Sequence, residues 1–322
     1  MGRKWGMGLG LVLSSALAFG QPSTEVTPGT VNYVEGQASL NGQELTQQSV
    51  RNTRLHSGQE LDTQRGNVEL LLTPGVFLRL GNDSSLRMVS PGLANTEVDL
   101  LRGSAMLEVD QLYKQNNLDV VVDGATAHIQ KRGLYEFNAN PPAAMVFEGQ
   151  AKVLTGEREV KVKGGHELLV AENGRPKPQE FDKTAAEQDA LYRWSRLRSE
   201  YESEANTEMA RTIYLYGGWY GPGWYWDPYW SAYAWMPGYG PFYGPFGYPF
   251  IGPGYGLGIG FGFGGVYGYP RFYGHGERFE HGYRGGFHEG GFHGGELHEG
   301  GGFHAGGFRG GGGFHGGGGR RG

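Results

Sequence analysis

Hydrophobic and polar side chains alternate with a period of two through most of residues 21–182. The runs Val68–Leu72, Leu118–Val122 and Val160–Lys163 show the pattern plainly. Successive side chains of a β-strand point to opposite faces, so this spacing predicts strands with one buried face and one face toward water. The carboxylates among the alternating residues are therefore expected on solvated faces: Asp99, Glu108, Asp110 and Asp119.

Turn-forming residues divide the same region into short segments. They include Asn41-Gly42, Pro74-Gly75, Asp123-Gly124 and Gly164-Gly165. Most gaps are near the roughly 8–12 residues typical of sandwiches, barrels and short solenoids. No helical period interrupts the strands, which argues against a parallel α/β fold. The sequence therefore predicts an all-β domain over residues 21–182, built as an antiparallel-rich β-sandwich or a short β-solenoid.

The period changes to three or four residues between positions 183 and 212. Asp182 precedes this segment and is the expected N-cap of one amphipathic helix. The apolar stripe of that helix is formed by Leu191, Trp194, Leu197, Tyr201, Ala205 and Met209. The simpler interpretation is that the stripe packs on the β-domain, and the alternative is that it binds a partner.

Glycine, proline and aromatic residues dominate residues 213–273, where no long helix or central strand is expected. Exposed aromatic rings on this scale favour contact with a partner, a glycan or a membrane interface. The candidate contact residues are five tryptophans: Trp219, Trp224, Trp226, Trp230 and Trp235. The alternatives are that the rings pack on themselves or on the β-domain, or that they drive self-association.

Residues 274–322 repeat aromatic-histidine steps in a glycine matrix, and we expect this tail to be disordered because ordering so much glycine costs too much entropy. Spaced imidazoles in a flexible chain bind Zn²⁺, Ni²⁺ or Cu²⁺. The candidate metal ligands are His288, His293, His298, His304 and His315. We expect such binding to be adventitious and predict no resident cofactor; metal buffering by the tail is the alternative.

The first residues are typical of a signal peptide. Arg3 and Lys4 precede an apolar run over residues 5–19, and Ala18-Phe19-Gly20 provides small residues for cleavage before Gln21. The run is shorter than the roughly 20 residues that span a bilayer as a helix. We therefore expect residues 1–20 to direct export to the periplasm, cell envelope or exterior, with an uncleaved membrane anchor as the alternative.

Composition and motifs exclude several classes of chemistry. The 322-residue chain has no cysteine, so it forms no disulfide, thiolate metal site or cysteine nucleophile. Its 28 basic and 33 acidic residues give no electrostatic footprint for nucleic acid. His166-Glu167 begins like a zinc-protease motif but lacks the second histidine, and Gly256–Gly260 imitates a dinucleotide loop without its flanking strand and helix. We predict that the protein is not an enzyme.

A series of short turn-and-strand segments in the β-region has the order and spacing of a known family. The segments are Gly29–Val31, Val34–Gly36, Leu55–Thr63, Gly66–Gly75, Leu78–Gly81, Ser84–Leu86, Leu100–Ala105 and Phe147–Val153. The series, over residues 28–172, resembles the FecR domain, a periplasmic β-rich module of iron-dicitrate signalling. A second, weaker resemblance, in Tyr192–Arg198 and Gly217–Pro228, is to a C-terminal extension of FecR-like exported proteins of soil bacteria. Neither resemblance implies catalytic residues.

The resemblance also bears on function. Signalling FecR proteins join this domain to a membrane helix and a cytoplasmic segment that controls a sigma factor, but only Met1–Lys4 precede the apolar run here. We therefore predict a non-enzymatic cell-envelope protein whose FecR-like domain binds an envelope protein or polymer, with the tail serving adhesion or scaffolding. The alternatives are an envelope signalling component and metal buffering.

Overall fold

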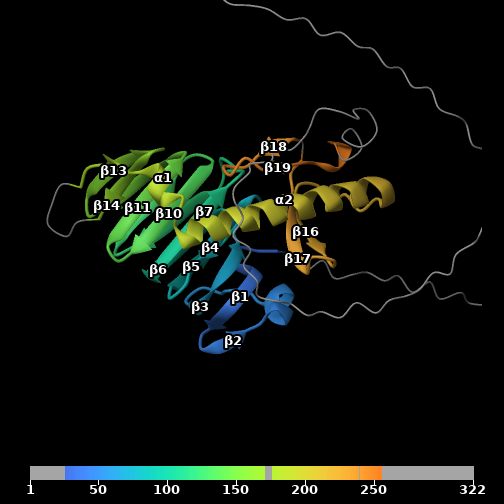
Figure 1. The fold of residues 1–322 in the computed structure, drawn as a ribbon, viewed down its shortest axis with the longest axis horizontal. Coiled ribbons are helices and arrows are strands. Elements are labelled where there is room, and N and C mark those ends of the chain that lie inside the picture. Colours follow the sequence, from blue (N-terminus) through green and yellow to red (C-terminus); the bar gives the residue numbers. More distant parts are fainter. Residues whose placement is uncertain (1–25, 171–175, 239, 256–322) are drawn as a thin grey trace, which may run out of the picture. The chain divides into compact units, whose positions relative to one another are not determined.

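The structure is a computed structural model that describes residues 26–170, 176–238 and 240–255 (Figure 1). The strands are β1 (Thr30–Leu40), β2 (Gln43–Leu45), β3 (Glu60–Leu71), β4 (Val76–Leu80), β5 (Ser85–Pro91), β6 (Asn95–Arg102), β7 (Ser104–Val109), β8 (Asn117–Val122), β9 (Ala125–Ile129), β10 (Gly133–Ala139), β11 (Pro142–Glu148), β12 (Gln150–Thr155), β13 (Arg158–Lys163), β14 (His166–Leu169), β15 (Gln179–Glu180), β16 (Gly223–Asp227), β17 (Ala232–Met236), β18 (Phe242–Tyr243) and β19 (Pro249–Phe250). The helices are the 3₁₀ turns η1 (Gln47–Asn52) and η2 (Pro253–Tyr255) and the α-helices α1 (Lys183–Ala186) and α2 (Ala190–Tyr216).

Strands β1 to β15 form a single sheet. Its path runs β13-β12-β9-β8-β6-β5-β3-β4-β7-β10-β11-β14-β15, and β1 pairs with β2 and β3. All neighbours are antiparallel except β6 and β8, which are parallel and are separated along the chain by β7. The prediction of an all-β, antiparallel-rich domain is confirmed.

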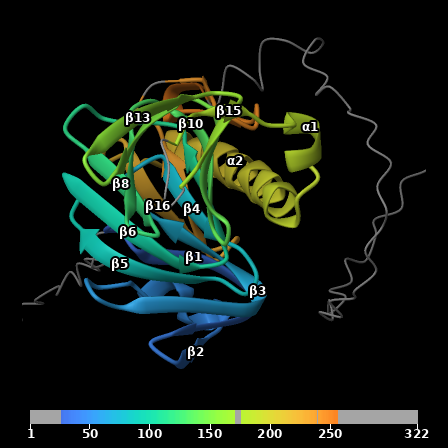
Figure 2. The ribbon, with the colours of Figure 1, turned by 90° about the vertical axis from the view of Figure 1, so that its left-hand side faces the viewer.

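The sheet folds over itself into two layers that enclose one core, so the sandwich rather than the solenoid describes it (Figure 2). Strand β10 contacts β6 and β8, and β11 contacts β8 and β13, although these strands are far apart along the sheet path. The alternating apolar residues that predicted the strands fill the space between the layers, among them Val98, Val120, Phe137 and Val146. Burial of these side chains is what holds the two layers together.

Strand β3 passes from one layer to the other, and two glycines make this possible. Its first residues pair with β5 and its last residues pair with β4. Between them Gly66 lies opposite Gly36 of β1, next to a register shift. Gly36 has a φ of 71°, and a Cβ there would lie 2.2 Å from the Arg65 carbonyl oxygen. Only glycine allows the two strands to bend this close together.

Helix α2 and the chain that follows it cover the outer face of β3, β4 and β7. In Figure 2, α2 lies on the side of β4 and β10, away from β5 and β6. Strands under this cover are buried on both faces: Leu70 and Leu71 of β3 are both fully buried. The prediction that Glu108 and Asp110 lie on solvated faces is therefore wrong, since both are buried under the helical layer. Asp99 and Asp119, outside that layer, are half-buried.

The helical region begins where predicted but is divided. Asp182 caps α1 by accepting the backbone N–H of Ala185 at 3.1 Å. A second aspartate, Asp189, accepts the N–H of Leu191 at 2.7 Å and starts α2. Helix α2 then continues to Tyr216, past the predicted end at 212.

Two predicted segments fall wholly outside the described residues, and two fall partly outside: the β-domain, at residues 21–25 and 171–175, and the aromatic region. The predicted signal peptide, 1–20, and the predicted disordered tail, 274–322, lie entirely outside, and so does the end of the aromatic region from 256 to 273. These predictions stay predictions. Of the helices in the described ranges, none has the length and apolar character needed to cross a membrane.

Candidate functional site

Three ionisable side chains lie together on the outer face of β3, β4 and β7. Glu69 of β3 pairs directly with Arg79 of β4, and Arg79 lies beside the β7 segment that carries Glu108. The Arg79 Nε donates to Glu69 Oε2 at 2.8 Å, and its Nη1 donates to Glu108 Oε2 at 2.5 Å. All three side chains are fully buried. One guanidinium thus bridges two carboxylates within the sheet.

The side of helix α2 that packs on this face of the sheet carries polar side chains in the central turns of the helix. Its buried polar residues are Ser195, Arg198, Ser199, Glu202, Ser203 and Asn206. The predicted apolar stripe is right for Leu191 and Ala205, which are buried, but wrong for Leu197 and Tyr201, which are 45% and 39% exposed. The helix is turned this way because the buried charges of the sheet need polar partners, which the predicted stripe does not supply.

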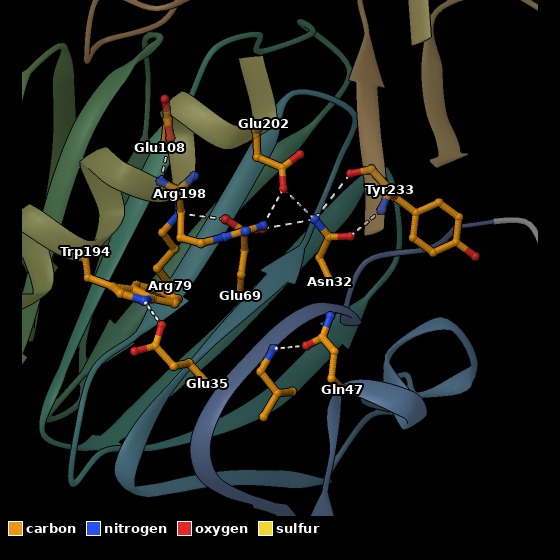
Figure 3. A network of polar contacts seen from close by, with 11 residues as sticks. Asn32, Glu35, Gln47, Glu69, Arg79, Glu108, Trp194, Arg198, Glu202 and Tyr233 are labelled. Atoms are coloured by element: carbon orange, nitrogen blue, oxygen red, sulfur yellow. Dashed lines mark hydrogen bonds and ion pairs between the residues drawn. The ribbon is translucent and has the colours of Figure 1, made fainter. Parts of the chain in front are cut away.

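Arg198 and Ser199 join the helix to the sheet, and Figure 3 shows Arg198 between Glu69 and Glu202. The Arg198 Nη2 donates to Glu69 Oε1 at 2.9 Å and to Glu202 Oε1, one helical turn further on, at 2.6 Å. The Ser199 hydroxyl donates to Glu108 Oε1 at 2.7 Å. Asp110 is buried in the same region, two residues after Glu108. We call this set the ionic network: Glu69, Arg79, Glu108, Asp110, Arg198 and Glu202.

The carboxyl pKa values of the ionic network diverge. Burial raises the pKa of Glu69, but the two arginines outweigh burial and hold that pKa below its usual range. Burial raises the pKa of Glu108 in spite of the arginine beside it. Burial, together with a neighbouring carboxylate, raises the pKa values of Asp110 and Glu202 well above their usual range. The arginines therefore suffice to hold some of these acids ionised but not all of them.

Two asparagines connect the ionic network to residues 217–255, which we call the aromatic segment. Asn32 of β1 accepts the N–H of Tyr233 at 2.7 Å and donates to Glu202 at 3.0 Å. Asn206 of α2 accepts the N–H of Ile251 at 2.7 Å and donates to the carbonyl of Trp235 at 2.8 Å. The two side-chain amides form hydrogen bonds with backbone N–H and C=O groups that would otherwise be paired with a neighbouring strand. The backbone of the aromatic segment is therefore hydrogen-bonded to side chains of the sandwich and of α2.

The five candidate tryptophans occupy different environments. Trp235 of β17 is fully buried, and its ring centroid lies 5.2 Å from that of Phe250. This burial corrects the expectation for Trp235, because packing against the β-domain leaves the ring no surface for a partner. Trp219 is 41% exposed. The remaining three are half-buried: Trp224, Trp226 and Trp230.

Three rings form a parallel set at the surface, which we call the aromatic stack. The Tyr225 ring is nearly parallel to those of Trp219 and Tyr220, with centroid distances of 5.9 Å and 6.3 Å and interplanar angles of 3° and 14°. Tyr220 is 90% exposed. The Tyr225 hydroxyl accepts the Tyr220 N–H and donates to the Gly221 carbonyl, both at 2.8 Å, so the stack is locked to β16.

The segment that carries the aromatic stack is itself almost free of charge, although Arg51 of the sandwich lies over the Trp226 ring, 4.9 Å from its centroid. Between Ile213 and Pro270 the sequence contains one charged residue, Asp227. That carboxylate is buried, and it accepts the backbone N–H groups of Tyr229 and Trp230. The segment therefore contributes no exposed charged side chain beside its exposed aromatic rings.

A shallow groove of about 360 Å³ lies elsewhere, on the exposed face of β8, β9, β12 and β13. Its charged residues pair across the strands: His128 Nδ1 lies 2.8 Å from Asp119 Oδ1, and Lys152 Nζ lies 2.8 Å from Glu159 Oε1. These are exposed cross-strand pairs of the kind that stabilise a sheet surface. Across the part of the chain that the structure describes, no three histidine, aspartate or glutamate side chains are grouped to hold a metal ion. The candidate ligands of the tail lie outside that part: His288, His293, His298, His304 and His315.

Comparisons with known proteins give little further guidance. No protein family and no curated protein matches the chain. Two crystal structures of a candidate anti-sigma factor from Parabacteroides distasonis are similar to part of this chain, each with a TM-score of 0.35. The first is 17% identical in sequence, and the match covers 41% of this chain and 64% of that one. The second is 16% identical, and the match covers 39% of this chain and 62% of that one. The chain thus spans less than two thirds of those structures. Similarity at this level carries no functional argument, and the FecR resemblance stays a prediction.

Proposed function

We propose that the protein is a non-enzymatic binding module of the cell envelope, in which a FecR-like β-sandwich presents the aromatic stack to an uncharged polymer. The observation that carries the proposal is the aromatic stack itself. Its outer ring, Tyr220, is 90% exposed although the segment that bears it is folded onto the sandwich. Exposed aromatic surface held in a fixed position is typical of a binding site.

The chemistry of the surface favours an uncharged ligand. Anionic lipids and nucleic acids are bound through clusters of lysine and arginine, and the segment around the stack has none. Sugar rings present flat faces of C–H groups that lie well against aromatic rings. A neutral polysaccharide therefore fits the stack better than a charged polymer does.

The way the rings are held also favours binding. Tyr225 belongs to β16, which pairs with the buried strand β17. Its two hydrogen bonds fix the turn that carries Trp219 and Tyr220. The backbone that carries the rings is therefore already ordered, and less entropy is lost when a ligand is bound than would be lost by a flexible loop.

The test is cosedimentation of the full chain with purified neutral cell-wall polysaccharide, comparing the wild type with the double variant Trp219→Ala/Tyr220→Ala. Loss of two aromatic anchors is expected to weaken binding roughly tenfold or more. The matched control is Tyr243→Ala/Tyr255→Ala, which removes two rings that are 55% and 47% exposed outside the stack and should leave binding unchanged.

Equal binding by the wild type and the stack variant would refute the proposed site. Crosslinking in intact cells provides the second arm of the experiment. A stack-dependent crosslink to one protein, with no binding to polysaccharide, would overturn the polymer proposal in favour of a protein partner, which aromatic anchors also serve.

A further inference from the structure

The ionic network contains more acid than base. Its carboxyl groups are Glu69, Glu108, Asp110 and Glu202, and its guanidiniums are Arg79 and Arg198. All are buried. If every carboxyl were ionised, two negative charges would remain in the interior without a countercharge from the network. Buried ions are tolerated only when they are paired, so these two charges require another form of neutralisation.

Asp110 is one of the two excess acids. Both of its carboxyl oxygens are buried and neither has a hydrogen-bond partner. Gly244 covers it so closely that a Cβ there would lie 2.7 Å from Asp110 Oδ1 and 3.2 Å from Glu108 Oε1. Gly244 therefore closes one side of the two carboxyls. The charged groups that face Asp110 are Glu108, Arg79, Arg132 and Glu202.

Glu202 is the other excess acid. Its Oε1 accepts from Arg198 and from Asn32, while its Oε2 is buried without a partner. Arg198 and Arg79 are both already bonded to Glu69. The charged groups that face Glu202 are Glu69, Arg198, Arg79 and, from β7, Asp110. A proton on Glu202 would remove the repulsion between the two glutamates and leave the Arg198 bond to Glu69 intact.

We propose that the ionic network is a proton-controlled latch: α2 and the aromatic segment dock on the β-sandwich with Asp110 and Glu202 in their neutral, protonated forms. The aromatic segment moves with α2 because Asn206, one turn after Glu202, holds the backbone of both Trp235 and Ile251. The Ser203 hydroxyl adds a bond to the carbonyl of Pro249 at 2.5 Å. A rise in pH would therefore loosen the segment that carries the aromatic stack.

The direction of the pH effect follows from the burial of the two acids. Burial raises the pKa values of both carboxyls in the docked state, so docking is strongest at low pH and weakens as pH rises through those raised values. Hydrogen exchange of the α2 amides in the full chain, corrected for its intrinsic pH dependence, measures docking between about pH 5 and pH 9. Protection is expected to fall about tenfold per pH unit for each proton released. This readout needs no ligand, so its failure is separate from failure of the binding function.

Two substitutions distinguish a protonated latch from ordinary ion pairs. Glu202→Gln and Asp110→Asn copy the neutral acids, so each should retain α2 protection at high pH and flatten the pH dependence. Glu204→Gln, on the exposed side of the same helix, is the control and should behave like the wild type. Loss of protection by Glu202→Gln at about pH 5 would show that the ionised carboxylate holds the helix, and it would overturn the latch. A wild-type protection that does not change with pH would overturn it too.

Discussion

The substitution Trp235→Ala tests whether the aromatic segment is part of the folded unit. The Trp235 ring is fully buried on the outer face of the sandwich, in a cluster with Leu71 and Phe77 of the sheet and with Phe250. It also fits closely over Gly75, where a Cβ would lie 2.9 Å from the indole. If the segment is an integral layer of the domain, removal of this ring must destabilise the whole domain.

The expected loss of stability can be estimated from the burial of the side chain. A tryptophan buries about 150–250 Å². At about 25 cal/mol per Å² this corresponds to about 4–6 kcal/mol as an upper bound. Large-to-small substitutions of aromatic core residues cost about 3–5 kcal/mol, and we expect Trp235→Ala to fall in that range.

Urea denaturation of the full chain, followed by circular dichroism for the strands and by tryptophan fluorescence, measures this loss. Both signals should shift together in one transition. Trp235→Phe keeps most of the contact and removes an indole N–H that has no partner, so it should cost about 1.5 kcal/mol or less. Trp219→Ala, at the surface, should stay within about 0.5 kcal/mol of the wild type. A Trp235→Ala loss below about 1 kcal/mol, or a shift in fluorescence alone, would refute the reasoning.

Two further predictions concern the buried charges. Arg79→Met should destabilise the protein by about 3–5 kcal/mol in the same denaturation assay, because two buried carboxylates lose their shared guanidinium; a loss near zero would contradict it. Burial raises the pKa of Glu136 to about 7 in the folded protein. The contribution of Glu136 to the free energy of unfolding is therefore complete below the ordinary carboxyl pKa of 4.5 and is lost as the pH rises to about 7, a change of about 3 kcal/mol at most. Glu136→Gln should therefore lose less stability than the wild type between about pH 5 and pH 8, and identical pH profiles would contradict this.

Periodicity and turn residues predicted the all-β domain and its helix, but they left a sandwich and a short solenoid open until the packing between layers was seen. The alternation in β8 and β13 marks residues such as Val120 and Val162, which are buried in the core. Glycine at positions 36 and 66 marks the bend that carries β3 between the layers. These features are local, since they depend on which side of a strand faces inward and on which backbone angles a residue tolerates.

The ionic network was not predicted, although part of its signal is visible in the sequence. Ser195, Ser199 and Ser203 recur every four residues on one side of the helix, and Arg198 and Glu202 lie one turn apart. Small and polar residues at this spacing are equally typical of a solvated helix face. Only the buried carboxylates of the sheet show that this side points inward.

The sequence by itself determined that the region before Asp182 is built of β-strands, that the helix begins near Asp182, and that the extension is aromatic and almost uncharged, but it did not predict strands β16 to β19 of that extension. It could not determine which face of each element is covered. A side chain such as Glu108 or Trp235 has the same local sequence pattern whether or not another layer lies above it. Three features arise only when α2 and the aromatic segment fold back across the sheet. Charged side chains of the sheet become buried, α2 packs with a different face from the predicted apolar stripe, and the tryptophans divide into packed and exposed rings. The reason is that burial depends on contacts between distant parts of the chain.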